Sequence, residues 1–211
     1  MAYTGTISTN RTARTGLSLL KMLSNRQEKI GSRIRDRLSV IGKRRIRDAV
    51  SGEAAILISI LLRQSEPRFL LTRRTESVAT HKGQISFPGG MRENGDSDLM
   101  ATALREAEEE IGVESSRVKV LGDFHDYMAV TGQLVRPYAG ILPEQSSFRV
   151  NQEEVAYLLE VPFSFFVDTV PRIETRYSSD KAHEVLFYDY DGEVIWGLTA
   201  RIIKDFIDEI L

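Results

Sequence analysis

FPGGMRENGDSDLMATALREAEEEIGV, residues 87–113, is the stretch from which the rest of this chain can be interpreted. It holds four glutamates in five positions. At about 100° per residue on a helix, Glu106, Glu109 and Glu110 fall within an arc of roughly 100°, whereas Glu108 points elsewhere. Apolar residues recur at helical spacing on roughly the opposite side: Met100, Leu104, Ala107 and Ile111. The pattern predicts a helix that packs one side into a core and presents carboxylates on the other.

This row of carboxylates has two interpretations. Like charges three and four residues apart destabilise a helix by roughly 0.2–0.5 kcal/mol per pair, which a solvated surface tolerates and a bound cation relieves. Clustered carboxylate oxygens suit Mg²⁺ or Mn²⁺, which favour substrates that bear phosphate oxygens. Gly89 and Gly90 precede the predicted helix and Gly112 follows it, allowing a tight entry and a left-handed helix stop. This context favours a metal site over a solvated acidic surface.

The same residues resemble a known signature. Gly90 is followed after five residues by Asp96, and after eight more by the run REAEEEIGV at 105–113. This arrangement resembles the Nudix box of the Nudix hydrolases. The usual box has Glu in place of Asp96 and seven residues after it. The longer spacing with Asp is similar to that of the coenzyme A pyrophosphatase branch.

The resemblance to that branch extends over roughly residues 53–211. It includes LLTRR at 70–74, Gly83, the FPGG run, VTG at 130–132, EEV at 153–155 and WGLTA at 196–200. Two positions depart from the branch: Thr75 stands where Ser or Ala is usual, and Ala79 stands where an arginine is usual. Because an arginine can hold a phosphate, the second departure bears on the coenzyme A assignment more than on the hydrolase assignment.

The resemblance implies an α/β fold, a Nudix-like α/β/α sandwich with a mixed central sheet. It also implies metal-dependent hydrolysis of the diphosphate bond of coenzyme A or its thioesters. Glu106, Glu109 and Glu110 would hold Mg²⁺ or Mn²⁺. The general base would be Glu106 or an acid of the 153–154 pair, with Glu154 as the candidate from that pair. Arg105 is expected to orient a glutamate through a salt bridge.

Substrate contacts are expected from a second group of residues: Arg74, His81, Gly89, Gly90, Thr131 and Gly132. Several of these have plainer interpretations. His81 and His125 are lone histidines without a ligand-spaced partner, so loop or surface roles compete with phosphate contact. Thr131 and Gly132 are explained equally well by a turn between strands. Asp96 and Asp98 are candidates to cap the predicted helix.

The chain is expected to divide into a disordered basic arm or targeting segment (1–27), a helical extension (28–52) and the hydrolase domain (53–211). Residues 1–50 hold 12 Lys/Arg against 3 Asp/Glu. Within them the cluster KRRIR at 43–47 is expected to be a solvated helix face. In the domain, 54–62 is predicted as a buried central strand, 185–190 and 193–196 as a hairpin, and Thr199 as the cap of a final amphipathic helix.

Composition excludes several function classes. The chain has no cysteine, which excludes disulfides, thiolate catalysis and Cys-ligated zinc, and no apolar run approaches the ~18–20 residues that span a membrane. A cytoplasmic location is expected in a bacterium, and the mitochondrial matrix is an alternative in a eukaryote. The expected partner is a small nucleotide-type substrate such as coenzyme A and not nucleic acid; a homodimer is left open.

Three alternatives to the coenzyme A hydrolase are kept. The first is hydrolysis of another nucleoside diphosphate derivative, such as ADP-ribose or NADH. The second is a non-catalytic nucleotide sensor on the same scaffold, which the intact glutamate trio argues against. The third is an RNA-end processor that uses the basic N-terminal arm.

Overall fold

The computed structural model describes residues 27–47, 51–64, 66–77, 82–144, 148–178 and 181–211. The predicted arm therefore lies outside the described residues, apart from its last position, and so do His81 and Ala79. Among the described helices, none is both long enough and apolar enough to cross a membrane.

The larger sheet is mixed and has eight strands. Its main path runs β3-β2-β1-β7-β5, with β4 also paired to β1, β6 to β7 and β8 to β2. β1 and β7 are parallel, and the other pairs are antiparallel. The strands are β1 (Glu53–Leu62), β2 (Pro67–Arg74), β3 (Ile85–Ser86), β4 (Gly89–Met91), β5 (Lys119–Asp123), β6 (Tyr127–Met128), β7 (Leu134–Ile141) and β8 (Val155–Pro162). The predicted central strand at 54–62 is confirmed as β1.

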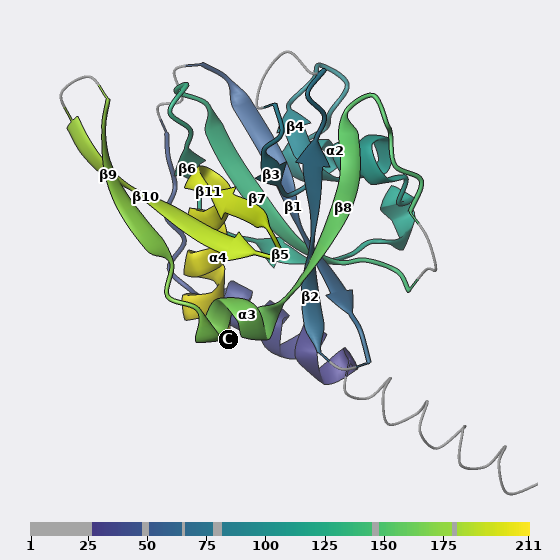
Figure 1. Ribbon diagram of the computed structural model, residues 1–211. Helices are drawn as coiled ribbons and strands as arrows, with labels where there is room; N and C mark the ends of the chain where they lie inside the picture. The colour runs from purple at the N-terminus through teal and green to yellow at the C-terminus, as the bar shows by residue number, and fades with distance from the viewer. Residues whose placement is uncertain (1–26, 48–50, 65, 78–81, 145–147, 179–180) are drawn as a thin grey trace, which may run out of the picture.

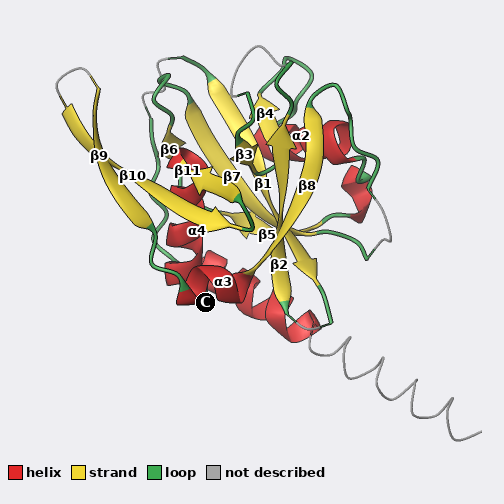
Figure 2. Ribbon diagram, viewed as in Figure 1, coloured by secondary structure: helices red, strands yellow, loops and turns green. Residues whose placement is uncertain are grey.

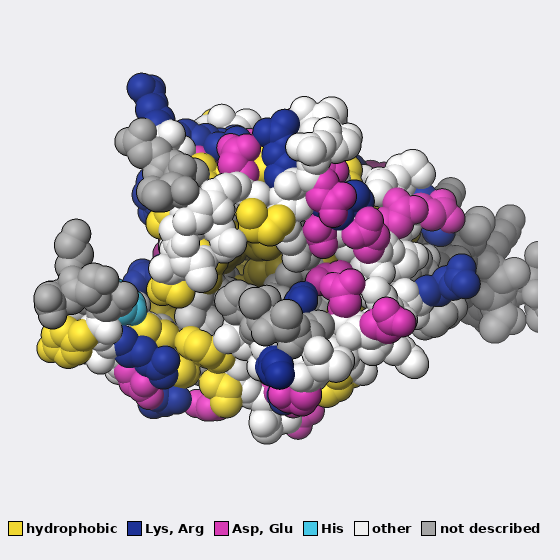
Figure 3. Space-filling model, turned by 90° about the horizontal axis from the view of Figure 1, so that it is seen from above, with side chains coloured by type: hydrophobic (Ala, Val, Ile, Leu, Met, Phe, Trp, Pro, Cys, Tyr) yellow, Lys and Arg dark blue, Asp and Glu magenta, His cyan; other side chains and the backbone are white. Residues whose placement is uncertain are grey.

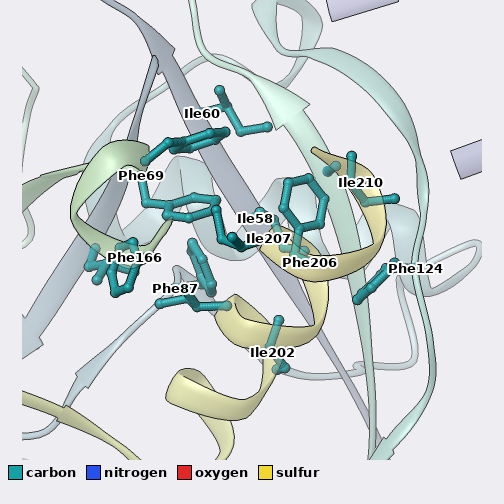
Figure 4. Packing of buried hydrophobic residues seen from close by; sticks show 14 of the residues in the cluster. Ile58, Ile60, Phe69, Phe87, Phe124, Phe166, Ile202, Phe206, Ile207 and Ile210 are labelled. Carbon is teal, nitrogen blue, oxygen red and sulfur yellow. The ribbon is translucent and has the colours of Figure 1, made fainter. Parts of the chain in front are cut away.

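Helices cover both faces of this sheet (Figure 2). Because side chains alternate along a strand, Ile58 and Ile60 of β1 join one hydrophobic cluster with Phe206, whereas Leu57 and Leu61 join the other. The first cluster includes residues of α3 (Phe163–Asp168) and α4 (Gly197–Ile210), and Figure 4 shows its aromatic centre. The second includes residues of α2 (Leu99–Ile111), followed by the short 3-10 helix η1 (Ser115–Arg117). The α/β/α sandwich with a mixed sheet is confirmed.

A smaller antiparallel sheet, in the order β11-β10-β9, projects from the body of the molecule (Figure 1). It consists of β9 (Arg172–Ser178), β10 (Lys181–Tyr190) and β11 (Glu193–Trp196). The predicted hairpin is confirmed: Tyr190 pairs with Glu193, and the turn residues Asp191 and Gly192 both have positive φ, 50° and 81°. Strand β9 was not among the predicted elements.

The segment before the sheet differs from the predicted helical extension. Residues 27–40 are helical, and this helix buries Ile34 and Leu38 in the cluster on the α4 side. Residues 42–47 are not helical. The basic cluster therefore does not form a solvated helix face, and that prediction is wrong. Its charges are used in ion pairs instead: Lys43 and Arg45 with Asp123, Arg45 with Asp126, and Arg44 with Asp205.

Candidate active site

A cavity of about 400 Å³ opens where β4, α2 and the start of α4 meet. Figure 3 looks onto this hollow, with acidic side chains gathered on one side of it and hydrophobic side chains on the other. Its charged lining residues are Arg74, Glu106, Glu110 and Glu154. Its apolar wall includes Ile56, Phe87, Val135, Leu198 and Ile202. The cavity therefore combines a polar end suited to an anion and its counter-ion with an apolar end.

Helix α2 presents its acids to the cavity because both of its ends are fixed. The Asp98 carboxylate accepts a hydrogen bond from the Ala101 N–H at 2.8 Å, so Asp98 is the N-cap. Gly112 adopts the left-handed conformation (φ 67°), and its N–H donates to the Glu108 carbonyl at 2.9 Å. The predicted cap and helix stop are confirmed. Asp96 does not cap the helix; it accepts from Thr102 and Arg105 instead.

Gly89 and Gly90 bring the chain close to both β1 and α2. A Cβ on Gly89, where φ is 156°, would lie 2.6 Å from the Ile56 Cα. A Cβ on Gly90 would lie 2.5 Å from the Cδ of Glu106. Real Cβ atoms do not approach other atoms so closely. Gly89 therefore permits the pairing of β4 with β1, and Gly90 leaves the room that the Glu106 carboxylate occupies.

Glu110 is the most buried acid of the site, with a side chain only 2% exposed. Arg74 Nη1 donates to its Oε1 at 3.1 Å, while its Oε2 is buried and has no hydrogen-bond partner among the described residues. Burial raises the pKa of Glu110 to about 8, with Arg74 opposing the rise and Glu106 and Glu154 adding to it. Buried polar atoms normally have a partner, so this carboxylate oxygen is suited to bind a cation or to carry a proton.

Glu106 and Glu154 face the same cavity. Burial raises the pKa of Glu106; Arg105, whose Nη1 lies 3.0 Å from its Oε1, opposes this, and the charge of Glu154 adds to it. The Glu154 side chain is 44% exposed and lies 3.9 Å from Arg74 Nη2. Three carboxylates thus repel one another around one space, and a divalent cation would remove this repulsion.

Glu109 lies apart from these three. Its side chain is 54% exposed, does not line the cavity and accepts from Arg105 Nη1 at 3.0 Å. Arg105 also donates to Asp96 and to the Met91 carbonyl, so it links α2 to the end of β4. Hydrogen bonding from Arg105 holds the pKa of Asp96 well below its usual range. This network places Arg105 where it can orient Glu106 and Glu109.

Other predicted contacts are not in the cavity. Thr131 and Gly132 lie in the exposed turn between β6 and β7, where Thr131 Oγ1 donates to Gln133 at 2.6 Å; of this turn only Gln133 reaches the cavity lining. His125 was expected in a loop or at the surface; it lies in the loop between β5 and β6 but is not at the surface. It is buried, with Nε2 2.8 Å from Glu209 Oε2 and Nδ1 accepting from the Arg44 N–H.

The start of α4 also differs from the prediction. The helix begins at Gly197 after the N-cap Trp196, so Thr199 lies inside the helix and does not cap it. Thr199 lines the cavity instead, as do Gln84 and Ser86, and none of the three was predicted to be a site residue. The alternation of Gln84 and Ser86 beside the FPGG run was the one signal that could have indicated them. The Trp196 ring stacks on Phe187 at 5.9 Å, a packing role.

The residues present suit a divalent cation in their chemistry, although in the described part of the chain no three acidic or histidine side chains are already arranged to hold a metal ion. Carboxylate oxygens are the ligands that Mg²⁺ and Mn²⁺ prefer. Glu110 Oε2 is the buried atom that lacks a partner, and Glu106 and Glu154 stand beside it in the same lining. A cation here would draw its ligands from Glu110 and Glu106 first.

The raised pKa of Glu110 predicts how the metal-free protein responds to pH. Its ordinary value is 4.5 and its folded value about 8, so between these the folded state keeps a proton that the unfolded chain releases. The free energy of unfolding should therefore fall as pH rises through this window, by on the order of 5 kcal/mol. Urea unfolding with EDTA at pH 5 and pH 9 measures this, with Glu110→Gln as the reference. The same pH slope in both proteins would contradict the prediction.

The sequence of this chain is similar to those of known proteins. A family model described as NUDIX domain matches residues 54–164. A Yersinia enterocolitica protein named uncharacterized Nudix hydrolase NudL is 40% identical over 167 residues, which cover 77% of this chain and 83% of the relative. A Photorhabdus laumondii protein of the same name is 38% identical over 165 residues, covering 74% and 84%.

Two solved structures are similar at lower identity. One is a C. elegans Ap4A hydrolase in a binary complex, 16% identical with a TM-score of 0.46, covering 53% of this chain and 80% of that one. The other is the NUDIX domain of Shewanella oneidensis NrtR complexed with ADP ribose, also 16% identical with a TM-score of 0.46, covering 64% and 86%.

Proposed function

This chain belongs to the Nudix hydrolase family, and from that premise we propose that it cleaves the diphosphate bond of coenzyme A or acyl-coenzyme A. The products are adenosine 3′,5′-bisphosphate and (acyl-)4′-phosphopantetheine. The hydrolase domain in this proposal is residues 53–211. The observation that carries it is the cavity that gathers Glu106, Glu110, Glu154 and Arg74 at one end.

The metal requirement follows from this gathering of charge. In our proposal Glu106 and Glu110 hold Mg²⁺ or Mn²⁺, with Glu109 beside them on the outer side of α2. When bound, the ion neutralises the diphosphate and lowers the pKa of a bound water. Without it, three carboxylates in the cavity would repel an anionic substrate.

Arg74 is the residue best placed to contact a phosphate. One of its nitrogens is bound to Glu110, while its Nε is buried without a hydrogen-bond partner among the described residues. A planar guanidinium can bind two oxygens at once, so Arg74 can hold Glu110 and still offer donors to the diphosphate.

Glu154 is the general base in our proposal. Both candidates line the cavity but differ in exposure: the Glu106 side chain, next to Gly90, is 15% exposed, whereas that of Glu154 is 44% exposed. A base must take a proton from the attacking water and then release it to solvent, which the more exposed carboxylate can do. Arg105 acts as a positioning residue through its 3.0 Å contact with Glu106.

The alternatives are weakened by specific contacts. An RNA-end processor would use the basic N-terminal arm, most of which lies outside the described residues. In the described cluster at 43–47, Lys43, Arg44 and Arg45 are paired with acids of the domain. A nucleotide sensor has no need of a buried, unpartnered carboxylate such as Glu110. Hydrolysis of ADP-ribose or NADH uses the same polar end of the cavity and remains the second candidate function.

A substrate panel tests the proposal. Coenzyme A, acyl-coenzyme A, ADP-ribose and NADH are assayed with Mg²⁺ and with Mn²⁺, and the products are identified by mass. We expect kcat/KM for a coenzyme A substrate to exceed the others by at least about tenfold, which corresponds to roughly 1.4 kcal/mol in transition-state binding. Cleavage of ADP-ribose without cleavage of either coenzyme A substrate would overturn the substrate assignment and leave the hydrolase assignment intact.

A further inference from the structure

Strand β9 forms an exposed edge of the smaller sheet. Within the described part of the chain it pairs only with β10, and Figure 1 shows it as the outermost strand of the projecting arm. Two of its large apolar side chains are exposed, Ile173 at 53% and Tyr177 at 77%. An edge strand of this kind presents unpaired backbone N–H and C=O groups, and proteins usually protect such edges. No described strand pairs with the outer side of β9.

The side chains of β9 are complementary to themselves. In the run Ile173-Glu174-Thr175-Arg176-Tyr177, an antiparallel copy with Thr175 opposite Thr175 places Ile173 opposite Tyr177 and Glu174 opposite Arg176. A two-fold axis normal to the sheet repeats each pair. Opposite charges and apolar side chains in directly paired positions stabilise antiparallel strands. The interface would be isologous, as in most homodimers.

Neighbouring registers are disfavoured by charge. With Glu174 on the axis, Glu174 would face Glu174 and Arg172 would face Arg176. With Arg176 on the axis, the two Arg176 side chains would face each other. Like charges directly opposite destabilise a strand pair. Within one molecule Glu174 contacts Arg172 and Arg176 along the strand, the latter at 3.3 Å, so its charge already lies between theirs on one face.

We propose that two copies of this chain associate through β9 in the register centred on Thr175, joining their smaller sheets into one six-stranded sheet. The proposal does not depend on the substrate. None of the residues of β9 lines the cavity, so turnover per subunit serves as an independent readout of folding.

Charge reversal tests the register. The full chain is examined by analytical ultracentrifugation over a range of concentrations. Glu174→Arg and Arg176→Glu should each raise the dimer dissociation constant by about tenfold or more, because each variant places like charges in both pairs. The double variant, Glu174→Arg with Arg176→Glu, should restore the wild-type value. An equimolar mixture of the two single variants should form a heterodimer, since one strand then carries two arginines and the other two glutamates.

The controls separate loss of pairing from loss of folding. Arg176 also lies over the Phe187 and Trp196 rings, so its replacement could loosen the arm. Unchanged turnover and rescue by the double variant or the mixture exclude that explanation. Arg35→Glu, a reversal on the exposed side of the 27–40 helix, should leave the dissociation constant unchanged. A wild-type protein that stays monomeric at every concentration, or single variants that dimerise like wild type, would overturn the proposal.

Discussion

Glu110→Gln is expected to lower turnover of the preferred substrate by about 10³-fold, on the order of 4 kcal/mol in the activation barrier. Glutamine has nearly the shape of glutamate, so the side chain still fits between Arg74 and the cavity. It lacks the charge, however, and the buried Oε2 that has no partner among the described residues can then no longer neutralise a divalent cation. Steady-state kinetics with saturating Mg²⁺ or Mn²⁺ measures the loss.

The matched control for this variant is Glu108→Gln, two residues earlier on the same helix. Glu108 does not line the cavity; its carboxylate accepts from the Ser115 N–H and hydroxyl. Its replacement should leave turnover within about twofold of wild type, as is usual for surface changes. Wild-type turnover in Glu110→Gln as well as in Glu108→Gln would contradict the proposal that Glu110 holds the catalytic metal.

Local sequence signals predicted the parts of the fold that local chemistry determines. Helix α2 could be placed because apolar periodicity, the Asp98 cap and the Gly112 stop all lie within the helix or next to it. The continuous apolar run of β1 and the Asp191–Gly192 turn are signals of the same kind. Each depends on residues a few positions apart, and each of these elements is confirmed. The packed side of α2 is only partly as predicted: Ala107 and Ile111 are buried, but Met100 is 38% exposed and Glu110 is buried.

Other features depend on residues far apart in the chain. The 43–47 cluster looked like a helix face, but its conformation follows from ion pairs with Asp123, Asp126 and Asp205, some 80 to 160 residues away. His125 is buried because helix α4 brings Glu209 to it. Strand β9 gave no strong signal because its described side chains, at 172–177, are exposed or only partly buried, and its partner strand follows later in the chain.

The candidate site depends both on local sequence and on residues far apart in the chain. A helical arc groups Glu106, Glu109 and Glu110 correctly on one side of α2, but the arc does not define the wall of the cavity. Strand β4, the turn before β8 and the start of α4 contribute to it, and they enclose Glu106 and Glu110 with Glu154. Arg105 binds Glu109 outside. Glu109 thus remains a predicted ligand that the structure does not bring into the cavity.

Gly90→Ala is expected to lower turnover by about 10²-fold with little change in stability. The added Cβ would lie 2.5 Å from the Cδ of the Glu106 carboxylate. This carboxylate is the end of a flexible side chain and can move away. The fold therefore accommodates the methyl group, but the carboxylate shifts. A displacement near 1 Å at a catalytic group can cost about 10²-fold in rate.

Two neighbouring glycines make the result interpretable. In Gly89→Ala the methyl group would meet backbone, 2.6 Å from the Ile56 Cα, at a φ of 156° that L residues rarely adopt, so the protein should lose about 2 kcal/mol or more of stability. Gly95→Ala adds a methyl group with no atom within 4 Å and should behave as wild type. Urea unfolding and kcat/KM are measured for all three. Of the three glycines only Gly90 faces a movable carboxylate, so only Gly90→Ala should lose activity without losing stability. Full turnover in Gly90→Ala would contradict the proposal that Glu106 holds the metal.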